Sequence, residues 1–169
     1  MSVAQIIPAS EEHLPAIADL ARRIWHGCYP TIITREQIEY MLTRMYSVET
    51  LEAELRSGIH YERLLIDGEL CGFASFGPTE QTDTIKLHKL YLHPNRHGHG
   101  FGTALLKHCE NEAQKLGARR LLLNVNKHNT KAIAMYQRNG FSIADSVIVD
   151  IGHGFVMDDY VMSKSRVSQ

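Results

Sequence analysis

The sequence lacks several features that would mark a special class of protein. It has only three cysteines, Cys28, Cys71 and Cys109, and they form no C-x-x-C pair, which argues against a disulfide framework and against a cysteine zinc site. With 5 prolines and 12 glycines among 169 residues, it is neither a low-complexity nor a collagen-like chain. No apolar run approaches the roughly 18 residues of a membrane helix, so no membrane partner is expected.

Neither sign of charge is in excess, with 18 Lys and Arg, 19 Asp and Glu and a net charge of -1. A nucleic-acid-binding domain usually has a basic face, so no nucleic-acid partner is expected. The first residues, MSVAQIIPASEEHLPAI, contain no basic segment followed by an apolar one and indicate no secretory signal. Because unpaired thiols are typical of a reducing compartment, we predict a cytoplasmic protein.

The chain does contain a regular succession of strand and helix signals, in a length typical of a single domain, 1–169. Strands are predicted over 3–9, 83–94, 119–126, 141–152 and 154–164, and a hairpin over 61–77 with its turn at Asp67-Gly68. Helices are predicted over 10–28, 34–46, 48–58 and 129–139, and from a glycine-rich stretch to Leu116. This order predicts a mixed α/β fold with a central sheet, because helices and strands do not alternate strictly.

The stretch HPNRHGHGFGTALL, residues 93–106, places glycines at 98, 100 and 102 between a strand and a helix. It is not a Walker loop, because no Lys-Ser or Lys-Thr follows the glycines. It is not a dinucleotide fingerprint either, because Thr103 stands where the third glycine belongs and no acid follows about 20 residues on. A simple chain reversal needs only one or two glycines. The pattern therefore favours a loop whose N–H groups bind a phosphate-bearing ligand at the start of the helix.

Two signatures in this part of the chain resemble those of the GCN5-related N-acetyltransferases (GNAT). The acyl-CoA loop of that family, Q/R-x-x-G-x-G/A, corresponds to residues 97–102, with His97 in place of Gln or Arg. The second signature, N-x-x-A-x-x-x-Y-x-x-x-G-F, is matched in NTKAIAMYQRNGF by Asn129, Ala132, Tyr136, Gly140 and Phe141. More loosely, IWHGCYPTIITREQIEYMLTRMY and DIGHGFVMDDYVMSK resemble bacterial members that are grouped with polyamine acetyltransferases.

The resemblance implies the GNAT fold, in which a mostly antiparallel sheet of six to seven strands is flanked by helices and splayed between the fourth and fifth strands. It implies acetyl-CoA as cosubstrate, with the diphosphate on N–H groups of the glycine loop and the pantetheine arm on the main chain of the preceding strand. The cofactor-binding residues expected from it are Leu90, Tyr91, Leu92, His97, Gly98, His99, Gly100, Phe101, Gly102, Thr103, Asn129, Ala132 and Tyr136.

Acetyl transfer to an amine needs a proton donor for the leaving thiolate and a route for the proton of the amine. The resemblance assigns the donor role to Tyr136; a core tyrosine that closes the helix is the alternative interpretation. Family members often carry a glutamate at the position of Lys86, and a charged lysine cannot accept a proton. His88, on the same strand, has a suitable intrinsic pKa and is the predicted catalytic base. His26, Glu36 and proton removal by water are the alternatives.

Aromatic and acidic residues outside the two signatures suit a cationic amine through cation–π and charge contacts. The substrate-binding residues predicted on this basis are Trp25, Tyr29, Tyr40 and Asp158, with Asp159 as the alternative to Asp158. The same pattern is also typical of a core stripe and a solvated turn. The histidines at 88, 93, 97 and 99 cross a strand, a proline and a loop, so their spacing predicts no metal site.

These observations predict an acetyl-CoA-dependent N-acetyltransferase that acts on a primary amine of a small, cationic, polyamine-like metabolite. A CoA-binding sensor or regulator without catalysis is one alternative, and acetylation of a protein N-terminus or lysine is another. The sequence leaves the identity of the acceptor and the oligomeric state open, and a homodimer is one of the states it permits.

Overall fold

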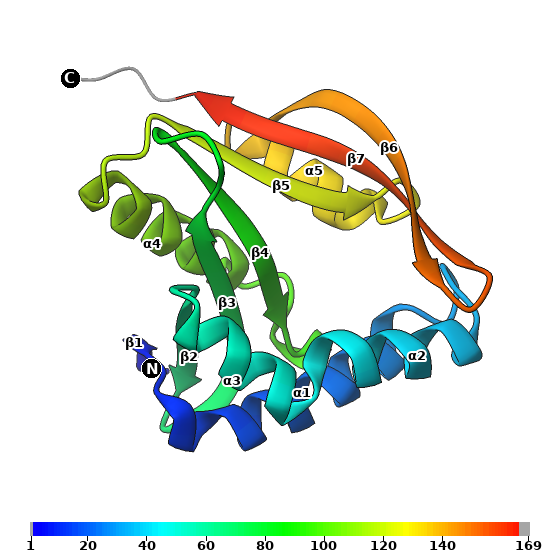
Figure 1. The fold of residues 1–169 in the computed structure, drawn as a ribbon. Coiled ribbons are helices and arrows are strands. Elements are labelled where there is room, and N and C mark those ends of the chain that lie inside the picture. The colour runs from blue at the N-terminus through cyan, green and yellow to red at the C-terminus, as the bar shows by residue number, and fades with distance from the viewer. Residues whose placement is uncertain (1, 166–169) are drawn as a thin grey trace.

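Seven strands form a single sheet in the computed structural model, which describes residues 2–165 (Figure 1). They are β1 (Ala4–Pro8), β2 (His60–Ile66), β3 (Glu69–Pro78), β4 (Thr84–Leu92), β5 (Arg120–Asn126), β6 (Ser142–Gly152) and β7 (Phe155–Ser165). Their order across the sheet is β1-β2-β3-β4-β5-β7-β6. Neighbouring strands are antiparallel except β4 and β5, which are parallel. The predicted mixed fold with a mostly antiparallel sheet is confirmed.

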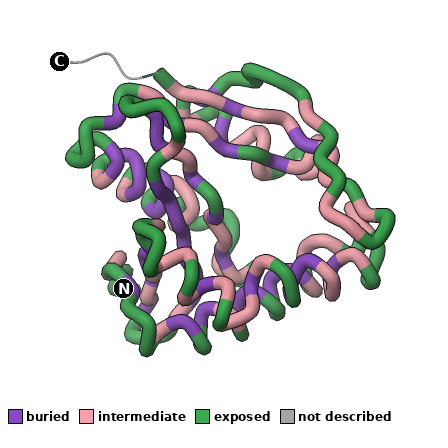
Figure 2. Tube along the Cα trace, in the orientation of Figure 1, coloured by how far each residue is buried: buried purple, intermediate pink, exposed green. Residues whose placement is uncertain are grey.

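Helices cover both faces of this sheet. They are α1 (Leu14–Cys28), α2 (Arg35–Tyr46), α3 (Val48–Arg56), α4 (Phe101–Lys115) and α5 (Thr130–Arg138), with short 3-10 turns at Glu11–His13 and Pro94–Arg96. Leu105 of α4 and Tyr136 of α5 belong to one core, whereas α1, α2 and α3 bury a second core against Phe73 of β3. Figure 2 shows the buried residues concentrated in the central strands and recurring along the helices. Within residues 2–165, no helix has the length and apolar composition that a membrane crossing requires.

Local sequence signals explain where the helices begin and where the first hairpin turns. The hydroxyls of Thr34 and Ser47 accept main-chain N–H groups at the starts of α2 and α3, which satisfies donors that have no partner inside the helix. Between β2 and β3, Asp67 and Gly68 have φ angles of 51° and 82°. Both angles are typical of a two-residue hairpin turn whose twist matches the strands, as the Asp-Gly pair predicts.

The strands β4 and β5 diverge about halfway along β4 (Figure 1). Their parallel pairing runs from Thr84 opposite Arg120 to Leu87 opposite Leu123 and extends no further. On its other side, β4 stays paired with β3 up to Leu92, apart from a β-bulge at His88. A bulge bends and twists the strand that carries it. The outer half of β4 therefore keeps one neighbour and leaves its second edge without a strand partner, which confirms the predicted splay.

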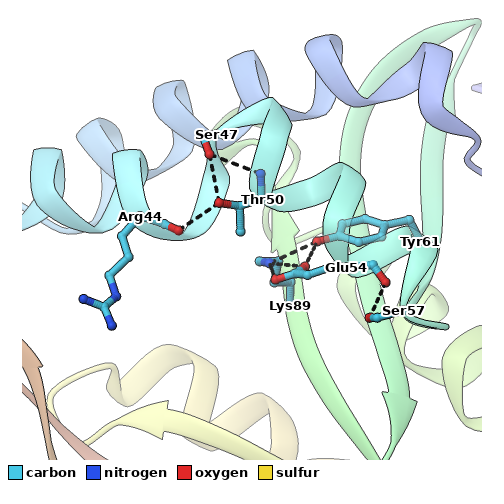
Figure 3. A network of polar contacts seen from close by, with 7 residues as sticks. All are labelled: Arg44, Ser47, Thr50, Glu54, Ser57, Tyr61 and Lys89. Carbon is cyan, nitrogen blue, oxygen red and sulfur yellow. Dashed lines mark hydrogen bonds and ion pairs between the residues drawn. The ribbon is translucent and has the colours of Figure 1, made fainter.

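A buried ionic cluster ties α3 to β4 directly after the bulge (Figure 3). The ammonium of Lys89 lies 2.9 and 2.8 Å from the two carboxylate oxygens of Glu54 and 3.0 Å from the hydroxyl of Tyr61, which itself donates to Glu54. The same ammonium lies 4.9 Å from the centre of the Tyr46 ring. Desolvation lowers the pKa of Lys89, and the charge of Glu54 opposes that shift. The cluster holds the Lys89 side chain in place where β4 turns away from β5.

The helix α2 is attached to the β6–β7 hairpin at the other end of the sheet (Figure 1). The Tyr40 hydroxyl donates to the carbonyl of Ile151, and Arg44 donates to the same carbonyl at 2.9 Å. The side-chain amide of Gln37 donates to the carbonyl of Val156 at 2.9 Å. These bonds join α2 to the β6–β7 hairpin. The N-terminal helices and the last two strands therefore lie on two sides of the splay.

The Lys89 cluster yields a stability prediction. Replacing Glu54 with alanine leaves the Lys89 ammonium buried without a carboxylate, and breaking a buried pair in this way costs about 3 kcal/mol. We expect the free energy of unfolding of Glu54→Ala, measured by urea titration, to fall by that amount. Glu49→Ala, on the exposed side of the same helix, is the control and is expected to lose less than about 1 kcal/mol. Equal losses in the two variants would show that the cluster adds no stability.

Candidate active site

The glycine loop presents unpaired main-chain donors and open space at the start of α4. Gly98 and Gly100 have φ angles of 81° and 82°, a conformation that favours glycine, and Gly100 directly precedes the helix. The N–H groups of residues 98–103 find no acceptor among residues 2–165. A Cβ added at Gly98, Gly100 or Gly102 would meet no atom within 4 Å. Such a loop, at the positive end of a helix, fits the diphosphate of a coenzyme A molecule.

Two histidines of the loop turn their rings toward its own main chain. The Nε2–H of His97 donates to the carbonyl of Leu92 at 2.9 Å, and the Nδ1–H of His99 donates to the carbonyl of His97 at 2.9 Å. His97 replaces the Gln or Arg of the family pattern, so this bond gives the replacement a local function: it holds the loop against the end of β4. Any contact of His97 and His99 with the cofactor stays a prediction.

The outer half of β4 supplies the edge on which a pantetheine arm could form hydrogen bonds. Leu90, Tyr91 and Leu92 pair with Ala74, Phe73 and Gly72 of β3. Pairing with β5 has already ended at Leu87. An extended ligand can add to a free strand edge through main-chain hydrogen bonds, and the glycine loop follows this edge directly in the chain.

The helix α5 brings Asn129 and Tyr136 to the same region. The Asn129 side chain caps the helix by accepting the N–H of Ala132 at 3.3 Å, and its amide donates to the Tyr29 hydroxyl at 3.3 Å. Tyr136 is 7% exposed and packs edge-on against Phe141, with ring centres 5.7 Å apart. Burial raises the pKa of Tyr136 above its ordinary value, so the phenol is protonated at neutral pH and able to donate.

The predicted aromatic wall divides into an inner and an outer part. Trp25 is 3% exposed and stacks on Tyr29, with ring centres 4.2 Å apart, so Trp25 lies in the core behind Tyr29. Tyr91 of β4 lies 5.9 Å from the Trp25 ring and belongs to the same cluster. Tyr40 is occupied by its bond to Ile151 and lies apart from these rings, at the hairpin. Of Trp25, Tyr29 and Tyr40, Tyr29 is therefore the best placed to contact a substrate.

The candidate bases differ in availability. Desolvation, followed by the charge of Lys86, lowers the pKa of His88 to about 4, although the ring is exposed at the bulge. His88 is thus neutral at pH 7 but a weak proton acceptor. His26 lies 2.7 Å from a carboxylate oxygen of Glu39, and Glu36 is exposed on the first turn of α2. The structure brings neither of these two side chains to the open edge of β4.

The adjacent acids of β7 point to opposite faces of the sheet, because side chains alternate along a strand. Asp158 forms an ion pair of 2.6 Å with Lys127 and shares its face with Met162, which packs with α4 and α5. Asp159 shares its face with Met157, which packs against the core of α1 and α2. Asp159, the alternative of the sequence analysis, is therefore the acid on the face of Tyr29, and Asp158 is already paired on the other face.

Sequence reasoning missed the Lys89 cluster and the neighbouring phenol of Tyr46. Tyr46 is 3% exposed, and desolvation raises its pKa, which an interaction with Tyr91 partly opposes. Tyr91 in turn interacts with Tyr29. A continuous row of polar groups thus runs from Asn129 into the core. No local pattern encodes it, because Asn129, Tyr29, Tyr91 and Tyr46 belong to four separate parts of the chain.

Known proteins with similar sequences and folds are acetyltransferases. The model of the acetyltransferase (GNAT) family matches residues 14–141. A spermidine N(1)-acetyltransferase of Thermoplasma acidophilum is 29% identical over 159 residues, covering 91% of this chain and 95% of that protein. The crystal structure of the PaiA N-acetyltransferase of Thermoplasma acidophilum in complex with coenzyme A superposes with a TM-score of 0.83 at 28% identity, covering 96% and 99% of the two chains. A streptothricin acetyltransferase of Streptomyces lavendulae is 33% identical over 76 residues, covering 45% and 40% of the two proteins.

The loop geometry selects Gly102 as the sharpest test of diphosphate binding. Gly100 has a positive φ, so valine there would also strain the main chain, whereas Gly102 has an ordinary helical conformation and open space around it. We expect Gly102→Val to raise the Kd for CoA at least tenfold, measured by calorimetry, with the melting temperature unchanged. Ala104→Val, on the opposite side of the same helical turn, is the control and should bind CoA normally. Normal binding by Gly102→Val would exclude the loop as the diphosphate site.

Proposed function

Because the chain belongs to the acetyltransferase (GNAT) family, we propose that it transfers the acetyl group of acetyl-CoA to a primary amine of a small cationic metabolite of the polyamine class. The N-acetyltransferase activity follows from the family, whereas the acceptor class is the proposal. The observation that best supports acetyl transfer is that the free edge of β4 leads into the unpaired donors of the glycine loop, while Tyr136 belongs to the core against which Leu90 of β4 packs.

The residues present fit acetyl-CoA as cosubstrate. The N–H groups of residues 98–103 would bind the diphosphate, and the main chain of Leu90, Tyr91 and Leu92 would bind the pantetheine arm. When bound, acetyl-CoA supplies an activated thioester carbonyl. A main-chain N–H of β4 would then lie beside the carbonyl oxygen, where it can stabilise the negative charge that develops during attack.

The acceptor amine has to lose a proton before it can react. An alkyl amine with a pKa near 10.4 is only about 0.04% neutral at pH 7, so the site has to remove a proton before the nitrogen can attack. On the donor side, the thiolate leaves as the tetrahedral intermediate collapses. Tyr136 is protonated at neutral pH and is our candidate for the group that gives the thiolate its proton.

The polyamine class is supported by two independent lines. One is the relative that acts on spermidine, since its similarity extends over 91% of this chain, including the N-terminal helices. The other is chemical: Tyr29 offers an aromatic face, and Asp159 offers a carboxylate on the same side of the sheet. Both groups favour a cation over a neutral or anionic acceptor.

Two other functions make different predictions. A CoA-binding sensor would bind CoA through the same loop and release no thiol with any amine. A protein acetyltransferase would prefer peptides with a free N-terminus or a lysine over small amines. A thiol-release screen that offers acetyl-CoA with small amines and with peptides separates the three functions.

Tyr136→Phe tests the catalytic assignment. Removing the hydroxyl eliminates the proton donor but keeps the ring packing, so we expect kcat to fall about 100-fold while the Kd for CoA stays within about twofold. The screen of amines is run on both proteins, with Tyr160→Phe on β7 as the control variant. Undiminished turnover in Tyr136→Phe would remove Tyr136 from the mechanism. Absence of turnover in the unmodified protein with every acceptor would favour the sensor instead.

A further inference from the structure

Asp159 is an exception among the buried charged side chains of residues 2–165. Lys89 pairs with Glu54 at 2.8 Å, and Glu110 pairs with Lys164 at 3.0 Å. Glu62, which is also buried, lies 3.4 Å from His108. The carboxylate of Asp159 is 3% exposed and forms no hydrogen bond or ion pair with any described side chain. Burying an unpaired carboxylate is costly, so its retention indicates a partner that binds there.

The charged groups around Asp159 come from three neighbouring elements. Lys86 of β4 and Lys127, directly after β5, attract its negative charge, and Asp158 repels it. Lys127 is itself paired with Asp158 on the opposite face. Tyr29, at the end of α1, lies close enough for the charge of Asp159 to act on its hydroxyl. One side of Asp159 is therefore lined by a phenol, and neither lysine compensates its charge by direct contact.

Tyr29 connects Asp159 with the proposed proton donor. Its hydroxyl accepts a hydrogen bond from Asn129, the cap of the helix that carries Tyr136. Besides desolvation, the charge of Asp159 contributes to the raised pKa of Tyr29, and Tyr29 in turn contributes to the raised pKa of Tyr136. On β5, Asn126 lies opposite Asp159, in the part of β5 that follows the end of its pairing with β4 at Leu123. Asp159 thus lies on the β7 side of the splay and is linked electrostatically to Tyr136 through Tyr29.

We propose that Asp159 receives the ammonium group of the acceptor and removes its proton; the proposal rests on the function proposed above. The carboxylate accepts one proton from the ammonium, and the freed nitrogen lone pair attacks the thioester carbonyl. The C–N bond forms, the C–S bond breaks, and the thiolate takes a proton from Tyr136. The nitrogen, which is positively charged after the attack, gives its extra proton back to Tyr136 and becomes the amide nitrogen. Asp159 releases its proton to solvent, so one proton leaves per acetyl transferred.

The electrostatic setting of Asp159 suits this role. Desolvation, followed by the charge of Asp158, raises the pKa of the carboxyl group, and Lys86 and Lys127 oppose the rise. A higher pKa makes a carboxylate a better proton acceptor. His88, with its pKa of about 4, lacks the negative charge that would attract an ammonium group. The negative charge and the raised pKa therefore favour Asp159 over His88.

Asp159→Asn tests the proposal through the pH dependence of kcat/KM with 1-aminobutane and 1,4-diaminobutane. In the unmodified enzyme, kcat/KM should rise until Asp159 has lost its proton and then stay level up to the pKa of the amine. In the variant, only the neutral amine reacts, so kcat/KM should rise about tenfold per pH unit toward the amine pKa near 10.4. At pH 7 we expect a loss of at least 100-fold with both amines. Asp145→Asn, an exposed acid on β6, is the control.

Each other outcome has a definite meaning. A loss confined to KM with the diamine would make Asp159 an anchor for the second nitrogen and would overturn the proposal. An unchanged pH profile would place the base elsewhere, with His88→Gln as the next variant. CoA affinity and melting temperature verify folding, and removing an unpaired buried charge should not lower stability. A lack of thiol release by the unmodified enzyme would instead refute the proposed function itself, before any variant is compared.

Discussion

The separation of β4 from β5 is the constraint on which the candidate active site depends. Pairing ends at Leu87 and Leu123, the bulge at His88 bends β4, and the pair of Lys89 with Glu54 fixes the strand beyond it. Main-chain groups inside a sheet normally bond to a neighbouring strand, and here one edge has none. The protein therefore offers its own main chain as a binding surface, and the side chains around the splay add the chemistry.

The parts of this site that could be predicted from sequence are the parts that local structure encodes. Gly98 and Gly100 have positive φ angles and Gly102 lies in the first turn of α4, so this short segment alone exposes the donors. Asn129 caps α5, and a fixed spacing along that helix sets the position of Tyr136. Each signal lies within about a dozen residues, so no knowledge of the strand order is needed to read it. The limits of the helices and strands follow from similarly local patterns.

The parts that could not be predicted depend on contacts between distant segments. Asp158 and Asp159 are adjacent and chemically alike, and only the pairing of Asp159 with Asn126 across β5 and β7 decides which acid faces α1. The bulge at His88 breaks the alternation of β4, so the faces of its outer residues cannot be counted from Lys86. Trp25 has the composition of a binding residue, yet the packing of Tyr29 over it places it in the core.

The two acids of β7 also show how a single strand can serve stability and chemistry together. Asp158 forms an ion pair with Lys127 on the face of α5, with 2.6 Å between the Lys127 Nζ and the Asp158 Oδ1. This lysine is therefore not free to neutralise Asp159 by direct contact. A close lysine would stabilise the carboxylate and make it a poorer proton acceptor. Without direct pairing, Asp159 keeps a raised pKa, which suits the proton-accepting role proposed for it, and a negative charge that would attract a cationic acceptor. In the proposed mechanism, the free-energy cost of burying the Asp159 carboxylate without a partner is what favours binding of an ammonium group.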